Sequence, residues 1–220
     1  MATLFLMRHG QAGDILGDYD RLSALGHEQC VAAGAAGSFV LPLCWARSGG
    51  MRRHQQSGAA FMQGLAAASP IAVHIDPRWN EFDHQDVIEV GLRAGLGALD
   101  GGDGLPGFFH EALGRWASGA HDADYREPYA VFCARVWAAF DDACADLPSG
   151  GAGIVFTSGG VIAAVCRSVL GLQPKSSFEL NAVLYNAGIS RFEVSGSRRS
   201  LVQLNLNPAG EADPRLRTRR

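Results

Sequence analysis

A continuous apolar run at residues 2–7 ends directly at Arg8, His9 and Gly10. A strand has this composition when helices cover both faces of a parallel sheet, because both of its faces are then buried. Ligand sites in open α/β sheets lie beyond the carboxyl ends of such strands. The run therefore predicts a buried strand that delivers a polar cluster to one edge of a sheet.

Apolar runs of strand length alternate with segments of helical character in the first third of the chain. This order predicts an α/β fold, a three-layer αβα sandwich around a mostly parallel, doubly wound sheet. A hairpin around Ser195-Gly196-Ser197 is expected to close the sheet. The predicted strands are residues 2–7, 43–46, 71–75, 154–157, 182–185, 189–194 and 201–206, and the predicted helices are residues 23–39, 51–68, 129–147 and 161–170.

The alternation stops at residues 82–149, where glycine-rich loop and helix replace it. We predict that this segment is an inserted subdomain that covers the active-site edge of the sheet. The 220 residues then form a single domain, 1–220, which is long enough for a full hydrophobic core.

The composition and net charge of the chain argue against a membrane protein and against a nucleic-acid-binding protein. No apolar stretch reaches the roughly 18 residues that a membrane span needs, and a net charge of -3 argues against a broad nucleic-acid-binding face. The five cysteines include no Cys-x-x-Cys pair, which favours a reducing compartment over disulfides or a zinc site. We therefore expect a cytoplasmic protein with no membrane or nucleic-acid partner, and its oligomeric state stays open. Four arginines within the last six residues are expected to form a frayed, solvated end.

Three polar clusters follow predicted strands, at residues 8–11, 47–52 and 158–160. Arginine side chains and the free N–H groups of a glycine-bearing helix N-terminus both suit phosphate oxygens. An imidazole beside a cation is held neutral, so His9 keeps a lone pair for attack on phosphorus. Glu81, just after the third predicted strand, is the best-placed acid for the leaving group.

Five segments, in this order along the chain, resemble the histidine phosphatase superfamily, which is also called the phosphoglycerate mutase-like clan. Residues 4–12 are similar to the family's nucleophile strand and loop, and the other four segments each follow a family pattern. These are residues 20–29 against D-x-L-[ST]-x-x-G-x-x-Q, residues 48–55 against S-P-L-x-R-A-x-Q, residues 79–81 against L-x-E, and residues 155–162 against V-x-x-H-G-G-x-I.

The resemblance implies a phosphohistidine on His9 and proton donation by Glu81, without a metal ion or other cofactor. It implies phosphate binding by two arginines, Arg8 and Arg52, whereas Arg53 is interpreted as a solvated helix residue. Further contacts to the substrate are expected from Gln11, Ser158, Gly159 and Gly160.

The sequence departs from these patterns at Ser158, where the family has a second histidine, and at Gly49, where proline is usual. That histidine contacts the phosphoryl group, and a serine hydroxyl donates one hydrogen bond without carrying charge. Loss of one such donor costs about 3 to 4 kcal/mol, or roughly 100- to 1000-fold in rate. His84, three residues after Glu81, is a candidate replacement. Ser158 is equally consistent with a helix N-cap, and one serine can do both.

The leading hypothesis is a metal-independent phosphomonoester hydrolase that acts on a small phosphorylated substrate through His9. The alternative is a catalytically impaired protein of the same fold that binds a phosphorylated ligand. A phosphoglycerate mutase is third, because Ser158 and Ile15 stand where mutases of the family have histidine and asparagine. The natural substrate would be set by the insertion at residues 82–149.

Overall fold

The computed structural model describes residues 1–13, 18–36, 42–65, 71–97 and 104–219. Within these ranges one sheet has six strands in the order β3-β2-β4-β1-β5-β6. The strands are β1 (Ala2–Arg8), β2 (Leu43–Ser48), β3 (Val73–Ile75), β4 (Ala152–Thr157), β5 (Ile189–Ser195) and β6 (Arg198–Leu206). The pairs β1–β4, β4–β2 and β2–β3 are parallel, and the terminal hairpin β5–β6 adds antiparallel strands beside β1. The predicted α/β class with a mostly parallel sheet is confirmed.

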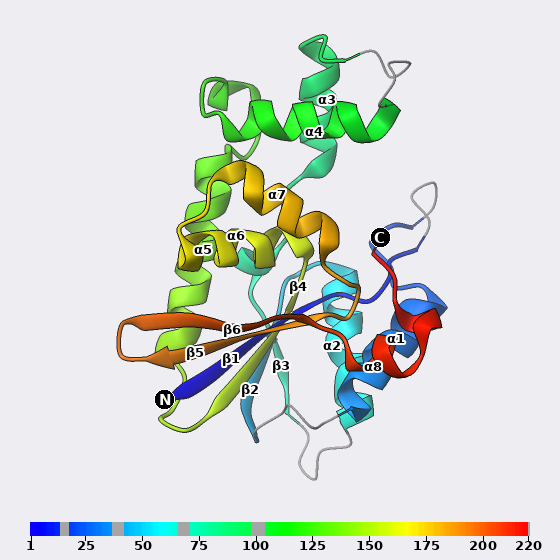
Figure 1. Ribbon diagram of the computed structural model, residues 1–220, viewed down its shortest axis with the longest axis vertical. Helices are drawn as coiled ribbons and strands as arrows, with labels where there is room; N and C mark the ends of the chain where they lie inside the picture. The colour runs from blue at the N-terminus through cyan, green and yellow to red at the C-terminus, as the bar shows by residue number, and fades with distance from the viewer. Residues whose placement is uncertain (14–17, 37–41, 66–70, 98–103, 220) are drawn as a thin grey trace.

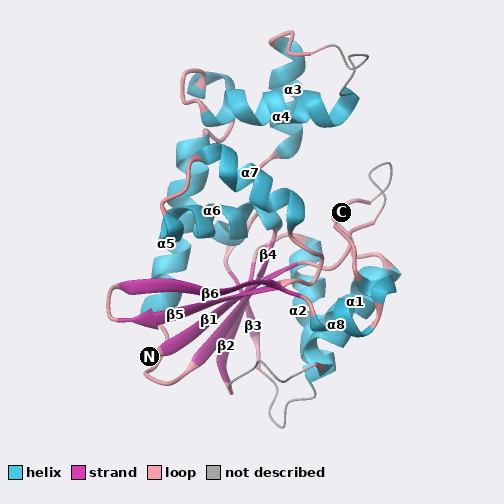
Figure 2. Cartoon of the chain, viewed as in Figure 1, coloured by secondary structure: helices cyan, strands magenta, loops and turns pink. Residues whose placement is uncertain are grey.

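Helices cover both faces of the sheet (Figure 2). On one face lie α1 (Ala24–Ala35) and α2 (Arg52–Leu65), with α8 (Pro208–Ala212) beside α1. On the other lie α5 (Tyr129–Ala145), α6 (Gly159–Leu170) and α7 (Pro174–Val183). The three layers match the predicted sandwich.

The side chains of β1 supply both hydrophobic cores. Leu4 and Leu6 belong to the cluster under α5 and α6, and Phe5 and Met7 belong to the cluster under α1 and α2. Successive residues of a strand point to opposite faces of its sheet, so an uninterrupted apolar run fills both cores. This burial explains why the run at the start of the sequence predicts a central strand.

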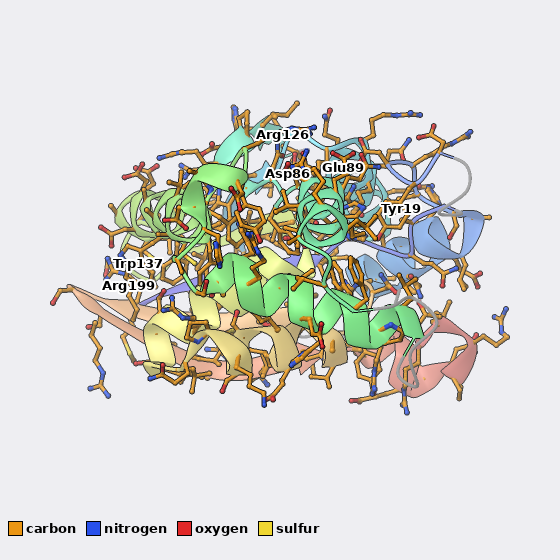
Figure 3. The ribbon with its side chains drawn as sticks, turned by 90° about the horizontal axis from the view of Figure 1, so that it is seen from above. Tyr19, Asp86, Glu89, Arg126, Trp137 and Arg199 are labelled. Carbon is orange, nitrogen blue, oxygen red and sulfur yellow. The ribbon has the colours of Figure 1, made fainter. Side chains whose placement is uncertain are left out.

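The helices within the predicted insertion at residues 82–149 do not all lie at the same place relative to the sheet. In Figure 1, α3 (His84–Arg93) and α4 (Gly104–Ala117) lie at the end of the molecule farthest from the sheet, whereas α5 runs along the sheet. Arg126 lies beside Asp86 and Glu89 of α3 (Figure 3), with guanidinium–carboxylate distances of 3.7 and 3.6 Å. The boundary of a subdomain at residues 82–149 remains a prediction.

The predicted strand at residues 182–185 is wrong, because residues 182 and 183 end helix α7. Pro174 occupies the first turn of this helix, where its missing N–H costs nothing. Phe178 and Leu180 pack against the larger core, so tertiary contact stabilises a helix that local sequence did not indicate. The predicted helix ends at residues 37–39 and 66–68, and Ile15, lie outside the described residues.

The predicted frayed end is also wrong for the described part of the tail. Leu216 is buried, and its carbonyl oxygen accepts a hydrogen bond from Gln29 Nε2 at 3.0 Å. The carbonyl oxygen of Thr218 accepts one from the backbone N–H of Asn186 at 2.9 Å. These bonds anchor the C-terminal segment against α1 and the loop before β5.

All five cysteines are free thiols, and three of them, Cys30, Cys144 and Cys166, are buried. Among the described helices, none combines the length and the apolar character that a membrane crossing requires.

Glycines allow α1 and α2 to approach until their backbones touch. A Cβ at Gly64 of α2 would lie 1.9 Å from the carbonyl oxygen of Val31, and a Cβ at Gly34 of α1 would lie 2.1 Å from that of Phe61. Real Cβ atoms do not approach other atoms this closely, so any larger residue would force the helices apart. The packing fixes the position of α2, which begins just after the carboxyl end of β2, against α1.

We predict that Gly64→Ala lowers the free energy of unfolding by about 1 to 3 kcal/mol, because the added methyl group meets backbone that cannot move aside. Gly114→Ala is the matched control, since it lies in helix α4 with open space around its Cβ position. That variant should gain up to about 1 kcal/mol from reduced unfolded-state entropy. Urea unfolding measures both changes, and equal effects of the two substitutions would contradict the packing argument.

Candidate active site

A cavity of about 630 Å³ opens at the carboxyl end of β1. Four of its lining residues, Arg8, His9, Arg53 and Glu81, come from the end of β1, the start of α2 and the segment after β3. The full lining consists of Arg8, His9, Tyr19, Arg53, Glu81, Phe82, His84, Ile88, Leu105, Pro106, Phe109, Asn181 and Arg219. The structure therefore brings three of the predicted residues, Arg8, His9 and Glu81, into one cavity.

His9 is buried and is hydrogen-bonded to two backbone carbonyl groups. Its backbone N–H donates to the carbonyl oxygen of Thr157 at 2.8 Å, and its ring Nδ1 lies 2.7 Å from the carbonyl oxygen of Gly10. Because a carbonyl oxygen only accepts, we assign the ring hydrogen to Nδ1. Nε2 then keeps the lone pair that a nucleophile needs.

The surroundings of His9 keep its imidazole uncharged. Burial lowers the pKa of His9 well below its ordinary value, and the neighbouring cations of Arg8 and Arg53 lower it further. Burial also lowers the pKa of Arg8, whose Nη1 donates to the carbonyl oxygen of Leu184 at 2.5 Å. A neutral ring beside cationic groups is the arrangement that the sequence predicted.

The segment at residues 20–29 anchors the loop that follows His9. Gln11 N–H donates to Gln29 Oε1 at 2.8 Å, and the Ser23 hydroxyl donates to the carbonyl oxygen of Gln11 at 3.0 Å. A Cβ at Gly10 would lie 2.2 Å from the carbonyl oxygen of Gly26, so this loop is in backbone contact with the first turn of α1. The backbone of Gln11 is thus held in this loop, Gln11 is not among the residues that line the cavity, and its role in substrate binding stays a prediction.

Glu81 follows the short helix η1 (Pro77–Trp79) and reaches the N-terminus of α6. Its Oε2 accepts from the backbone N–H of Gly160 at 3.0 Å, and its Oε1 accepts from that of Phe82 at 3.1 Å. Burial raises the pKa of Glu81, and the Gly160 hydrogen bond and the Arg53 cation oppose this rise. The carboxyl group is therefore shifted toward the protonated form that a general acid requires.

Arg53, and not the predicted Arg52, supplies the second arginine of the cavity. The side chain of Arg53 is 5% exposed and donates to Asp20 Oδ1 at 2.9 Å, whereas that of Arg52 is 55% exposed and pairs with Asp18 at 2.7 Å. Successive helix residues point about 100° apart around the axis, so a shift of one position turns the guanidinium away from the cavity. Within the described ranges, Nε of Arg53 is buried without a hydrogen-bond partner.

A sequence signal for Arg53 does exist. The arginine–glutamine spacing of the pattern S-P-L-x-R-A-x-Q fits Arg53 with Gln56 as well as it fits Arg52 with Gln55. Gln56 Oε1 accepts from the backbone N–H of Leu22 at 2.8 Å, and thereby ties α2 to the segment at residues 20–29. This pairing places one extra residue between β2 and the arginine that lines the cavity.

The residues after β4 lie beside the cavity but do not line it. Gly160 N–H is occupied by Glu81, so it does not face a ligand as predicted. A Cβ at Gly159 would lie 2.1 Å from Asn181 Oδ1 and 3.4 Å from Arg8 Nε. Ser158 is buried, and its hydroxyl contacts His54 Nε2 at 2.6 Å. None of these three residues is part of the cavity surface.

The remaining walls combine an apolar side and a polar rim, and of these residues the sequence indicates only His84. Ile88 of α3 joins Leu105, Pro106 and Phe109 of α4 on the apolar side. Tyr19, His84, Asn181 and Arg219 are the further polar lining residues. Burial lowers the pKa of His84, which makes this histidine less suited to supply the positive charge suggested for it.

Comparison with known proteins is consistent with this geometry. The family model of the histidine phosphatase superfamily (branch 1) matches residues 4–207. No curated protein sequence matches the chain significantly.

Solved structures of low sequence identity share the fold. A phosphoglycerate mutase from Bacillus anthracis is 16% identical with a TM-score of 0.69, and 94% of each chain is covered. A mutant phosphoserine phosphatase from Entamoeba histolytica, in complex with phosphoserine, is 17% identical with a TM-score of 0.64, covering 95% of this chain and 99% of the other. A mycobacterial glucosyl-3-phosphoglycerate phosphatase with inorganic phosphate is 23% identical with a TM-score of 0.61, covering 94% of this chain and 98% of the other.

We predict that Arg53→Ala weakens the binding of inorganic phosphate by about 10- to 100-fold, because it removes a buried charged donor. Arg52→Ala is the matched control on the same helix, and its exposed ion pair should contribute little to binding. Titration calorimetry measures both affinities. A larger loss in Arg52→Ala than in Arg53→Ala would contradict the assignment.

Proposed function

Because the chain belongs to the histidine phosphatase superfamily (branch 1), we propose that it hydrolyses phosphate monoesters through a phosphohistidine formed on His9. His9 carries this proposal. Its Nδ1 hydrogen is bound to the Gly10 carbonyl oxygen, so the Nε2 lone pair is free at the floor of the cavity beside Arg8, Arg53 and Glu81. Hydrolysis of a phosphate monoester by this route needs a neutral nucleophile, cationic groups that hold the phosphate, and an acid for the leaving group.

In the first step, His9 Nε2 attacks phosphorus while the bond from phosphorus to the leaving oxygen breaks. The carboxyl group of Glu81 gives its proton to that oxygen, so the alcohol departs uncharged. The raised pKa of Glu81 favours the protonated form before the reaction, and the lowered pKa of His9 favours the neutral ring.

In the second step, water attacks the phosphoryl group on Nε2. The Glu81 carboxylate takes a proton from this water, and the P–N bond breaks to give inorganic phosphate and neutral His9. Arg8 and Arg53 would hold the equatorial phosphoryl oxygens in both steps, because guanidinium forks match these oxygens and their charge grows in the transition state. These roles use only side chains of this chain.

The apolar wall favours a leaving group with an apolar part. Ile88, Leu105, Pro106 and Phe109 stand on one side of the cavity that also contains the cationic floor. Apolar surface buried there would contribute to substrate binding at about 25 cal/mol per Å². We therefore include aryl and alkyl phosphates among the test substrates.

The proposed location is the cytoplasm, because cysteines persist as free thiols in that reducing compartment.

The function is tested by turnover of p-nitrophenyl phosphate and a panel of phosphorylated metabolites. We expect wild-type activity and a loss of about 1000-fold or more in His9→Ala, because removal of a covalent nucleophile abolishes the intermediate. His27→Ala, an exposed substitution on α1, is the control. Activity that persists in His9→Ala would rule out the phosphohistidine route. Phosphate binding without any wild-type turnover would instead favour a binding protein.

A second prediction concerns pH. Glu81 must be protonated for the first step, so kcat/KM for an alkyl phosphate should fall as pH rises through its elevated pKa. The neutral form of His9 should persist at acidic pH, since its pKa is lowered. Glu81→Gln should slow alkyl phosphates by about 100-fold or more but p-nitrophenyl phosphate much less, because nitrophenolate leaves without a proton.

Glu179→Gln removes an exposed carboxylate on α7, outside the cavity, and is the control for the loss of one negative charge. Equal losses of Glu81→Gln with both substrate types would show that Glu81 does not act as the acid.

A further inference from the structure

A third arginine lines the cavity and takes no part in the mechanism above. Arg219 belongs to the C-terminal segment and stands on the polar rim with Tyr19, His84 and Asn181. Because burial lowers the pKa of His84, Arg219 is the rim residue that carries a full positive charge within the described lining. The cavity therefore has a cationic group in addition to the two arginines assigned to the phosphoryl group.

Hydrogen bonds connect the residue before Arg219 to the nucleophile. The backbone N–H of Asn186 donates to the carbonyl oxygen of Thr218 at 2.9 Å, and the Thr218 hydroxyl donates to Asn186 Oδ1 at 2.9 Å. Asn186 Nδ2 in turn donates to the carbonyl oxygen of His9 at 3.4 Å. Gln29 Nε2 also donates to Thr218 Oγ1, at 2.8 Å. Arg219 thus follows a residue whose position is fixed relative to His9.

The guanidinium group of Arg219 is held against Tyr185. Its Nη2 donates to the Tyr185 hydroxyl at 2.6 Å, and its central carbon lies 4.5 Å from the centroid of the tyrosine ring. The residue before Tyr185 is Leu184, whose carbonyl oxygen accepts from Arg8 Nη1 at 2.5 Å. Two consecutive residues therefore contact a phosphate-binding arginine and the arginine of the rim.

Arg219 differs from other arginines of the chain because it is not paired with an acid. Arg53 pairs with Asp20 at 2.9 Å, and Arg215, in the same C-terminal segment as Arg219, pairs with Asp213 at 2.5 Å. Within the described ranges Arg219 has no ion pair, and its hydrogen bond to tyrosine uses one of five N–H groups. An anion on the rim would therefore meet a guanidinium group whose charge no described carboxylate neutralises.

We propose that Arg219 is a specificity-determining residue that binds a second anionic group, carried by the alcohol part of the substrate. This inference rests on the proposed phosphatase function and deepens it, because it names a substrate class: phosphate monoesters whose leaving alcohol bears a carboxylate or a further phosphate. The phosphoryl group would lie at His9, Arg8 and Arg53, and the second anion on the polar rim. Guanidinium forks bind carboxylate and phosphate oxygens in the same bidentate way.

Aryl phosphates that differ in one charged group test the proposal. Phenyl phosphate is compared with its ortho-, meta- and para-carboxyphenyl counterparts and with para-phenylene bisphosphate. For the doubly anionic ester that wild type prefers, kcat/KM relative to phenyl phosphate should fall about 10-fold in Arg219→Ala. The loss should appear chiefly in KM, because the second anion is bound equally before and in the transition state.

The same series identifies the second anion. A larger loss with a carboxyphenyl phosphate assigns a carboxylate, and a larger loss with the bisphosphate assigns a phosphate. If the ratio to phenyl phosphate is the same in wild type and Arg219→Ala for every doubly anionic ester, the proposal is overturned.

Arg217→Ala is the matched control. Arg217 belongs to the same segment and its guanidinium carbon lies 5.9 Å from the centroid of the same Tyr185 ring, but Arg217 does not line the cavity. Its replacement should leave the ratio between the substrates at the wild-type value. Arg219→Lys should recover part of the preference, and Arg219→Glu should shift it toward the cationic para-aminomethylphenyl phosphate. Equal losses in Arg217→Ala and Arg219→Ala, or no shift in Arg219→Glu, would contradict a specific contact.

Failure of the proposed function is distinguishable, since it appears as absent turnover of all these esters in wild type. Titration calorimetry with phenylphosphonate and the three carboxyphenylphosphonates then tests the inference alone, because binding is measured without hydrolysis. The preference of wild type for a carboxylated phosphonate should fall about 10-fold in Arg219→Ala. An unchanged preference would overturn the proposal.

Discussion

Burial of an uncharged imidazole between cations is the constraint on which the active-site edge depends. His9 directly follows a strand that is covered on both faces, and its ring is buried with little access to water. A positive charge there would face Arg8 and Arg53 without solvent to screen it, and the pKa of His9 is lowered accordingly. The bond from Nδ1 to the Gly10 carbonyl oxygen then fixes the tautomer. The position of the strand end and the turn of its loop thus leave the lone pair of a neutral ring at Nε2.

The fold holds the other groups of the site by the same kind of local backbone bond. Asp20 accepts hydrogen bonds from both the backbone N–H of Arg52 and the guanidinium of Arg53, so one carboxylate positions the start of α2 and the buried arginine together. Glu81 bonds to the first turn of α6 through Gly160. Backbone contacts at Gly34 and Gly64 pack α2, the helix that carries Arg53 and His54, closely against α1.

The predictable part of the structure is the part dictated by local pattern. The strand before His9 was predictable because a fully buried strand must be apolar at every position, and the place of Glu81 in the cavity was predictable from its position just after the third strand. Arg52 was predicted in place of Arg53 because spacing alone does not tell which of two adjacent helix residues faces inward. Helix α7, the anchored tail and the use of Gly160 N–H by Glu81 arise from tertiary contacts, which a single sequence does not display. The pairing of His54 with Ser158 required the two elements to be brought together in space.

The phosphoryl-enzyme itself gives the most direct test of the account. The protein would be mixed with a radiolabelled phosphate monoester, quenched in alkali to preserve phosphohistidine, and digested for peptide mapping. The account predicts label on the peptide that contains His9, attached at Nε2, because Nδ1 is bound to the Gly10 carbonyl oxygen. Phosphate release without a labelled enzyme, or label at Nδ1, would contradict it.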